Sequence, residues 1–289
     1  MKMVVHSVYR LQRRLALGRE DVIVTLSDYK RQSGLLMSTL LPCVIGCHAV
    51  IFPFICSKQK PELWVETASN LAATIVAGSS KELGGANPAE IIDEYDQRRR
   101  RYPDLSSIRA TIVTDGCSPW AVTYTVSVGA QLAPFFFNIG SICPLVWSEL
   151  GGAVALRDPR NDLLSLPFSR EYLSFGVVRE KAALEPDAHA ILVYQNGPPL
   201  PGLDMAVVKP VKQPFDEGAK GDDQLKLNAS LQLSQSDEIG EIILSGDALD
   251  HQSFLSLENV GDRVFRCQVS YKATEMRATL SKFVCRLIS

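Results

Sequence analysis

The stretch 104–120, DLSSIRATIVTDGCSPW, contains a short β-branched apolar run at 110–113 that ends in the turn-forming pair Asp115 and Gly116. A run that is apolar at every position is typical of a strand buried beneath helices on both faces. Upstream, three further runs have the same character, at residues 22–26, 49–52 and 74–77. Together the four runs predict the central strands of a sheet.

Helix-like segments separate these runs. The clearest begins near Pro61, because the missing N–H of proline costs nothing at the first position of a helix. Apolar residues then recur at helical spacing along one face, at Leu63, Trp64, Ala68 and Leu71. Successive strands that are connected through helices most readily pair in parallel. The sequence therefore predicts an α/β protein whose parallel sheet is layered with helices.

Beyond Pro159 the pattern changes to strands without convincing helices between them. The linkers at 196–199 and 201–202 are rich in glycine and proline, which favours short turns. Successive strands joined by short turns predict an antiparallel sheet or partial barrel attached to the first layer. The strands expected here are 175–178, 190–194, 205–208 and 239–244.

We divide the chain into three parts on this basis. Residues 1–159 form the α/β part, and residues 160–250 form a β-rich part of the same domain. Within the second part, residues 212–237 are polar and charged, so they are predicted to be a mobile loop. The third part, 251–289, is a divergent tail with a helical stretch at 273–280.

The composition excludes several classes of protein. Apolar types make up 46% of the 289 residues and charged types 21%, which are ordinary globular values and exclude wholesale disorder. The net charge of −2 does not create the positive surface potential that attracts nucleic acid or an anionic membrane. The basic run 98–101 follows an acidic stretch at 90–96, so we interpret it as a solvated helix end. The alternative is a phosphate or partner site.

The seven cysteines are odd in number, widely scattered and without a CxxC pair. This spacing does not predict a zinc site, and it favours buried thiols in a reducing compartment. Residues 1–17 carry Arg10, Arg13 and Arg14 without an apolar block, so no secretory signal is expected.

Residues 116–148 contain no charged side chain, which raises the question of a membrane span. A spanning helix needs about 20 predominantly apolar residues. This stretch is interrupted by Pro119, Pro134 and Pro144 and carries several polar side chains. We therefore predict a buried core helix and strand here, and a protein without a transmembrane segment.

The common catalytic signatures, such as a phosphate-binding GxxxxGK loop or a GxSxG elbow, are absent from the sequence. His48 opens an apolar strand and is expected to be a core imidazole and not a base. Asp115 and Gly116 end a parallel strand, where open sheets bind ligands, although a plain turn would look the same. Glu149 is the first charge after the uncharged stretch, and it is either a turn residue or a metal-binding carboxylate.

The stretch that ends at Asp115 and Gly116 resembles the segment LSSLRxxIVADGANPW of the Disco-interacting protein 2 family. These proteins carry domains similar to fatty acyl-AMP ligases. The likeness covers roughly residues 20 to 246 in the same order. Further segments similar to the family are at 26–30 with Gly34 and Leu35, and at 142–144, 148–149, 153–159, 173–179, 200–202 and 236–242.

The resemblance implies the N-terminal-domain fold of adenylate-forming enzymes, which convert a carboxylate and ATP to acyl-adenylate and pyrophosphate with magnesium. By position, Asp115, Gly116 and Cys117 resemble the turn that lies along the adenine of ATP or AMP. Ser148 and Glu149 resemble the element whose carboxylate holds Mg²⁺ near the α-phosphate. Asp115, Gly116, Cys117 and Ser148 are thus the expected nucleotide-binding residues, and Glu149 is the expected metal ligand.

Departures from the family pattern limit this expectation. The Ser/Thr/Gly-rich phosphate loop does not precede Val22, and the region that carries the catalytic lysine is not matched after Gly246. We therefore expect a partial adenylate-forming domain that does not catalyse alone. The alternatives are a non-catalytic lipid- or nucleotide-binding or scaffold module in lipid metabolism, or a truncated gene product. The family likeness also implies a cytoplasmic protein with a fatty acid or acyl ligand.

Overall fold

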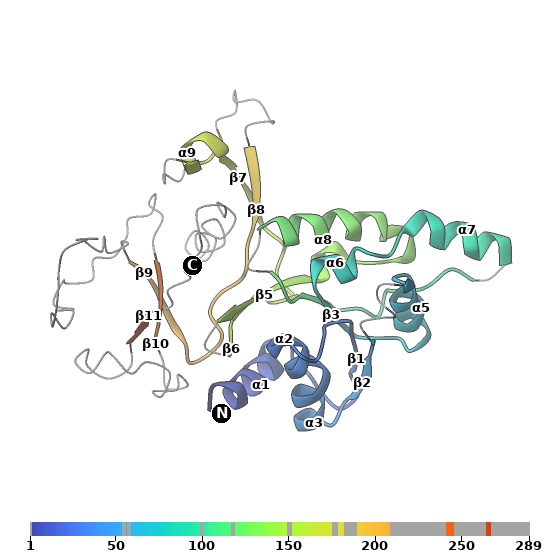
Figure 1. The fold of residues 1–289 in the computed structure, drawn as a ribbon, viewed down its shortest axis with the longest axis horizontal. Helices are drawn as coiled ribbons and strands as arrows, with labels where there is room; N and C mark the ends of the chain where they lie inside the picture. The colour runs from blue at the N-terminus through green and yellow to red at the C-terminus, as the bar shows by residue number, and fades with distance from the viewer. Residues whose placement is uncertain are drawn as a thin grey trace, which may run out of the picture.

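The structure is a computed structural model, shown in Figure 1. It describes residues 2–53, 56, 59–98, 101–116, 119–148, 152–174, 179–181, 190–208, 241–245 and 264–266. The expected strand 175–178, the polar loop 212–237 and the helical stretch 273–280 lie outside the described residues.

A six-stranded sheet forms the centre of the fold, and its first five strands run parallel, as the sequence predicts. The sixth strand pairs antiparallel with the fifth. The strand order is β2-β1-β3-β4-β5-β6. The strands are β1 (Val22–Thr25), β2 (His48–Ile51), β3 (Ile75–Gly78), β4 (Ala110–Val113), β5 (Ile142–Ser148) and β6 (Gly152–Leu156).

Helices cover both faces of this sheet, and Figure 1 shows α1 and α3 on one side with α8 on the other. Successive strand residues point to opposite layers, so that Ile23 packs in one hydrophobic cluster and Val24 in the other. This explains why the predicted strands are apolar throughout. The first layer is α1 (Lys2–Arg14), α2 (Gln32–Leu35), η1 (Leu36–Leu40) and α3 (Leu41–Ile45); the second is α5 (Leu63–Asn70), α6 (Ser80–Leu83), α7 (Pro88–Arg98) and α8 (Pro119–Gln131).

Strand β2 departs from the sequence prediction because it is the outermost strand of the described sheet. Its two end residues, His48 and Ile51, are exposed, and the residues between them are only half-buried. The expectation that His48 is a core imidazole is therefore wrong. A strand at the edge lacks a neighbour on one side, and an apolar run alone does not reveal this position.

The clearest helix predicted from the sequence is α5, which starts at Leu63, two residues after Pro61. Its buried residues are Trp64, Val65 and Ala68, whereas Leu71 follows the helix and is 38% exposed. The uncharged stretch 116–148 contains α8 and β5, which confirms the predicted core helix and strand. Among the described residues, no helix is both long and apolar enough to cross a bilayer.

The described residues of the second half of the chain form two small antiparallel sheets, and antiparallel strands were expected after Pro159. One pairs β7 (Ser165–Ser169) with β8 (Ala190–Tyr194). The other has the order β11-β10-β9, with β9 (Asp204–Val208), β10 (Glu241–Ser245) and β11 (Val264–Arg266). A short helix, α9 (Arg170–Ser174), follows β7. Strands β7 and β11 were not predicted from the sequence.

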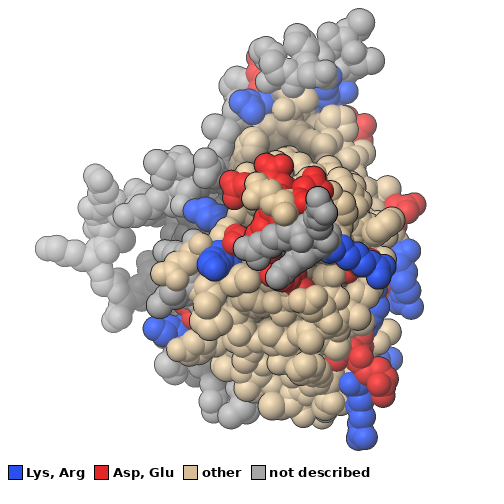
Figure 2. Space-filling view, turned by 90° about the vertical axis from the view of Figure 1, so that its right-hand side faces the viewer, with Lys and Arg blue, Asp and Glu red and all other residues tan. Residues whose placement is uncertain are grey.

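Helix α7 ends at Arg98, which confirms that the basic run begins at a helix end. Arg99 and Arg100 lie outside the described residues, and Arg101 is exposed. Figure 2 looks at this end of the molecule and shows a group of acidic side chains above a broad uncharged area, with further acidic side chains toward the margins of the view. The basic side chains on the same face lie singly around it.

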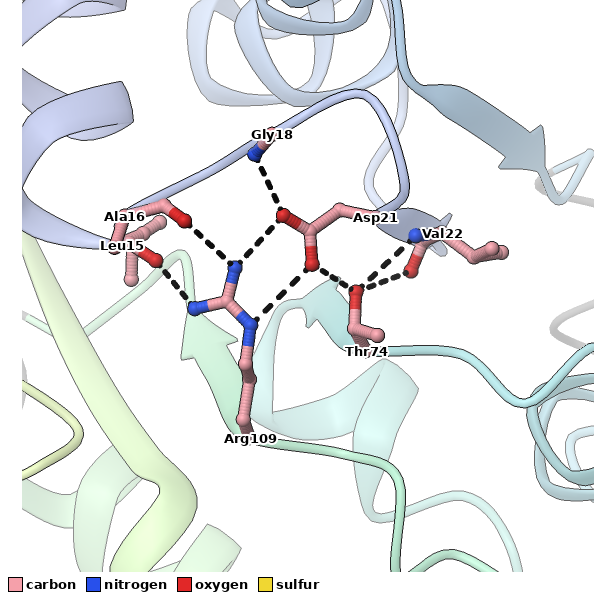
Figure 3. A network of polar contacts seen from close by, with 7 residues as sticks. All are labelled: Leu15, Ala16, Gly18, Asp21, Val22, Thr74 and Arg109. Carbon is pink, nitrogen blue, oxygen red and sulfur yellow. Dashed lines mark hydrogen bonds and ion pairs between the residues drawn. The ribbon is translucent and has the colours of Figure 1, made fainter.

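A polar network closes the amino edge of the parallel sheet (Figure 3). Asp21 precedes β1, Thr74 precedes β3 and Arg109 precedes β4. The Asp21 carboxylate accepts hydrogen bonds from Thr74 Oγ1 at 2.7 Å and from Arg109 Nη2 at 2.9 Å. Arg109 also donates to the backbone carbonyls of Leu15 and Ala16 at the end of α1. One ion pair therefore joins the starts of three strands to the first helix.

Candidate functional site at the carboxyl edge of the sheet

The direction of the chain connections reverses between β1 and β3. The chain leaves β1 to form β2 on one side, and then crosses back to form β3, β4 and β5 on the other. Open parallel sheets with this order bind ligands outside the carboxyl ends of the strands at the reversal. The topology therefore identifies the carboxyl ends of β1 and β3, with β4 beside them, as the candidate site.

Hydroxyl groups gather at this edge. Ser27, two residues after β1, lies with its Oγ 3.3 Å from Oγ1 of Thr114, which directly follows β4. Thr25, the last residue of β1, pairs in register with Ala77 of β3. The Thr25 side chain is fully buried, and its hydroxyl has no hydrogen-bond partner among the described residues. A buried hydroxyl without a partner is costly, which makes Thr25 the most unusual polar group of this edge.

The Asp115 carboxylate is held by the start of helix α6. Its Oδ1 accepts from the Ser80 backbone N–H at 2.7 Å, and its Oδ2 accepts from the Ser80 hydroxyl at 2.6 Å. The same helix begins with a capping box, in which Ser79 and Glu82 exchange side-chain and backbone hydrogen bonds. Asp115 therefore ties the loop after β4 to the loop after β3 and fixes the shape of the candidate site.

Gly116 packs against strand β5. A Cβ atom at this position would lie 2.7 Å from Pro144 Cα and 2.8 Å from the Leu145 nitrogen. No side chain fits there without moving the β5 backbone, so the structure gives glycine a packing role. The expected contact of Gly116 with an adenine ring is a separate role, and it stays a prediction.

The other expected site residues belong to the same region of the chain. Ser148 is the last residue of β5, which runs parallel to β4, so the carboxyl ends of these strands point to one edge of the sheet. Cys117, Glu149 and the side chain of Ser148 lie outside what the structure describes. The expected hollow between Asp115 and Glu149 therefore stays a prediction.

The described residues do not form a magnesium site by themselves. They contain no group of three or more His, Cys, Asp or Glu side chains that could hold a metal ion. Asp115 lies at the right edge, but both of its oxygens already accept hydrogen bonds from Ser80. A cation bound through Asp115 would therefore have to compete with these two bonds.

Analysis of the sequence missed Thr25, Ser27, Ser80 and Thr114. Each of them ends or follows a strand that the apolar runs predict. Because carboxyl ends of parallel strands meet at one edge, the same rule that selected Asp115 also applies to these hydroxyls. The bond between Asp115 and Ser80 joins residues 35 positions apart, and no local pattern indicates it.

Comparison with known proteins gives a consistent result. No family model matches the chain. Disco-interacting protein 2 homolog B of Homo sapiens is 29% identical over 229 residues, which cover 78% of this chain and 13% of that protein. The chain is similar to Disco-interacting protein 2. The Drosophila melanogaster protein of that name is 23% identical over 256 residues, 86% of this chain and 13% of the relative. The chain thus spans about 13% of the length of these relatives.

Solved structures similar to the chain include adenylate-forming domains. An adenylation domain of a keto acid-selecting NRPS module, bound to keto acyl adenylate, has a TM-score of 0.67 at 18% identity, over 92% of this chain and 45% of that one. Fatty acyl-adenylate ligases from E. coli and L. pneumophila give a TM-score of 0.68 at 14% identity, over 86% of this chain and 40% of that one. The chain therefore has the fold of part of an adenylate-forming domain, and its resemblance to Disco-interacting protein 2 is confirmed.

Proposed function

We propose that the carboxyl edge of the parallel sheet binds an adenine nucleotide of the acyl-adenylate type, and that this chain does not catalyse adenylation alone. Asp115, Gly116 and Cys117 lie along the adenine, and Ser148 with Glu149 faces the α-phosphate. The acyl group is that of a fatty acid. The acyl-adenylate in one of the similar structures is the precedent for this class of ligand.

The observation that carries this proposal is the set of hydroxyls at the reversal between β1 and β3. Thr25, the last residue of β1, keeps a buried hydroxyl without a partner among the described residues, and Ser27 and Thr114 of the same sheet edge lie with their hydroxyl oxygens 3.3 Å apart. Hydroxyls at this edge can donate to and accept from the phosphate and ribose oxygens of a nucleotide. Asp115 contributes by fixing the loop after β4 through Ser80, so that the site is formed before a ligand arrives.

The proposed absence of catalysis rests on the charges of the described site. Charge that develops on the α-phosphate requires cationic or N–H donors positioned around it. Magnesium would supply part of this stabilisation, with Glu149 as the proposed ligand, but the described residues alone do not complete its coordination. The hydroxyls of Thr25, Ser27 and Thr114 and the Asp115 carboxylate provide orientation and shape, and none of these four groups carries a positive charge.

Direct binding tests the proposal. Calorimetric titration of the 289-residue chain with a non-hydrolysable acyl-adenylate analogue is expected to show one saturable site. The substitution Asp115→Asn keeps the side-chain shape and is expected to weaken binding, whereas Asp162→Asn at an exposed position is the matched control. Absence of saturable binding by the unmodified chain, or equal binding by Asp115→Asn, contradicts the proposal.

Catalysis is tested separately by ATP–pyrophosphate exchange with fatty acids and magnesium. No exchange above background is expected from this chain. If exchange is measured, the chain is an active ligase, and Glu149→Gln should then abolish the reaction while the control Asp162→Asn retains it.

A specific observation favours a second candidate function, a non-catalytic lipid- or nucleotide-binding or scaffold module. Both oxygens of Asp115 are engaged by Ser80, which suits a structural role better than a role in turnover. In that case the chain binds AMP or a fatty acid with an affinity that does not change when magnesium is added. Titrations with and without magnesium distinguish this module from the acyl-adenylate site.

We also propose that the chain acts in the cytoplasm and in lipid metabolism, and that it is divided at residues 159 and 250 as the sequence indicates. The four cysteines of the described part, Cys43, Cys47, Cys56 and Cys143, are free thiols, which suits a reducing compartment. Cell fractionation and limited proteolysis test these two proposals. Protein in the secretory fraction, or stable fragments with other boundaries, would contradict them.

A further inference from the structure

Helix α1 packs on one face of the sheet beside β6, and a later segment of the chain joins the free edge of that strand. Ser7 Oγ accepts a hydrogen bond from the Ala153 backbone N–H at 3.1 Å. Along the edge of β6 that does not pair with β5, Leu200 N–H donates to the Val154 carbonyl at 2.8 Å. Residues 199–202 therefore continue the edge of the sheet beside α1.

Two arginines of α1, one turn apart, reach this segment. Arg14 Nη2 donates to the Pro199 carbonyl at 3.0 Å, and Arg10 Nη2 donates to the Gly202 carbonyl at 3.1 Å. The Arg10 side chain is only 6% exposed, and its second terminal nitrogen, Nη1, has no hydrogen-bond partner among the described residues. A buried guanidinium nitrogen without a hydrogen-bond acceptor is rare, because burial removes its hydrogen bonds to water and no protein acceptor replaces them.

The charged side chains of helix α1 do not neutralise the positive charge of Arg10. Helix α1 carries Lys2, Arg13 and Arg14 besides Arg10, and no acidic residue. Asp158, close enough to feel the charge of Arg14, is paired with Arg160 at 2.6 Å. Burial lowers the pKa of Arg10, whereas a carboxylate in contact would act in the opposite direction.

We propose that Arg10 Nη1 is the centre of an oxyanion site between α1 and the turn at 201–202, which binds a carboxylate or phosphate group. A planar guanidinium with one nitrogen held by Gly202 and the other available matches an oxyanion. Pro201 and Gly202 are exposed, and Gly202 places no side chain against Arg10 Nη2. Because Nη1 itself is buried, the oxyanion would enter beside this turn. Arg14 adds positive charge one helical turn away.

This site is separate from the candidate nucleotide site. Arg10 and Arg14 contact residues 199–202 beside β6, whereas Thr25 ends β1, four strands away in the sheet order. The proposed nucleotide-binding residue Ser148 ends β5, which pairs with β6, but neither arginine belongs to that set of residues. The oxyanion proposal therefore does not depend on the proposed function, and each can fail without the other.

The test is a calorimetric titration of the full 289-residue chain with inorganic phosphate and, in a second arm, with acetate, at constant ionic strength. Saturable one-to-one binding is expected in at least one arm, and the arm that binds identifies phosphate or carboxylate as the ligand. Arg10→Gln is expected to weaken binding at least about tenfold, the usual effect of losing one charge-assisted hydrogen bond. Arg13→Gln removes the same charge from an exposed position of the same helix and is expected to change the affinity less than about twofold, as a distant surface charge does.

A second measurement does not depend on whether the Arg10→Gln variant folds. In the unmodified chain, the ¹⁵N resonance of the Arg10 guanidinium should shift with the same saturation curve as the heat signal. The proposal is overturned if neither arm shows saturable binding. It is also overturned if Arg10→Gln binds with unchanged affinity or if the Arg10 resonance does not move on saturation, because the bound ion is then an adventitious ion only.

Discussion

The substitution Asp21→Asn is expected to destabilise the chain through the network at the amino edge. The variant keeps the shape of the side chain but removes the charge that faces Arg109. Asp21 is 8% exposed and accepts from Gly18 N–H at 2.8 Å as well as from Thr74 and Arg109. The change therefore weakens contacts that join α1 to three strands at once.

The expected size of this effect follows from burial. Removing one partner of a fully buried ion pair costs about 3–5 kcal/mol. The Arg109 side chain is 36% exposed, so solvent screens part of the interaction, and we expect about 2–3 kcal/mol for Asp21→Asn. Asp158→Asn is the matched control, because Asp158 pairs with Arg160 at 2.6 Å but the Arg160 side chain is 73% exposed. Its loss should be a small fraction of that for Asp21→Asn.

The effect should depend on pH in a defined direction. Burial of Asp21 opposes its ionisation, but the hydrogen bonds from Thr74, from the Gly18 N–H and from Arg109 together outweigh burial and lower its pKa. A carboxylate with a lowered pKa stabilises the fold fully above the unfolded pKa of about 4, and this contribution disappears as the pH falls through the folded pKa. The difference between the parent chain and Asp21→Asn should therefore shrink below about pH 4.

Urea unfolding followed by circular dichroism, at neutral pH and at several acidic values, measures these differences. The reasoning is refuted if Asp21→Asn and Asp158→Asn lose the same stability at neutral pH. A difference that stays constant down to the acid limit would show that the charge of Asp21 contributes nothing and that only its shape matters.

Three further substitutions or treatments test the packing of the site and its surroundings. Gly116→Ala should cost about 1–3 kcal/mol in urea unfolding, because its Cβ would lie 2.7 Å from Pro144; an unchanged midpoint would contradict this packing. Burial raises the pKa of the Cys143 thiol to about 12, so at pH 8 iodoacetamide should label exposed Cys43 and leave Cys143 unmodified in the folded chain; labelling of Cys143, read by mass spectrometry, would disprove its burial. Ser79→Ala removes the cap of α6 and should lower stability by about 1 kcal/mol, whereas a neutral result means that Asp115 alone fixes this helix.

Much of the sheet could be predicted because β1, β3 and β4 are buried on both faces. Each of them is apolar at successive positions, and a short run of this kind is typical of a strand that helices cover on both sides. The pattern was less informative for β2, where the same apolar composition occurs in a strand with exposed ends. An apolar run shows that its residues favour a buried strand. Whether the strand has a neighbouring strand on both sides depends on its position in the sheet, which the run does not reveal.

Helix α1 shows why other elements were missed. Its buried residues Val8, Leu11 and Leu15 recur at helical spacing, but they are separated by Arg10, Arg13 and other polar side chains, so no apolar block is visible. The candidate site was predicted only in part for a related reason. The turn at Asp115 is a local signal, whereas its attachment to Ser80 depends on contacts between distant parts of the chain.

The contact between Arg10 and Gly202 joins residues that are 192 positions apart. At bacterial or eukaryotic rates of synthesis, about 5–20 residues per second, roughly 10 to 40 seconds separate the two residues as they leave the ribosome. During that interval Arg10 and Arg14 lack their partners at residues 199–202, and the apolar side of the same helix lacks the part of its cluster that β6 supplies. A nascent chain therefore presents this helix to holding factors and proteases until most of the sheet has been made.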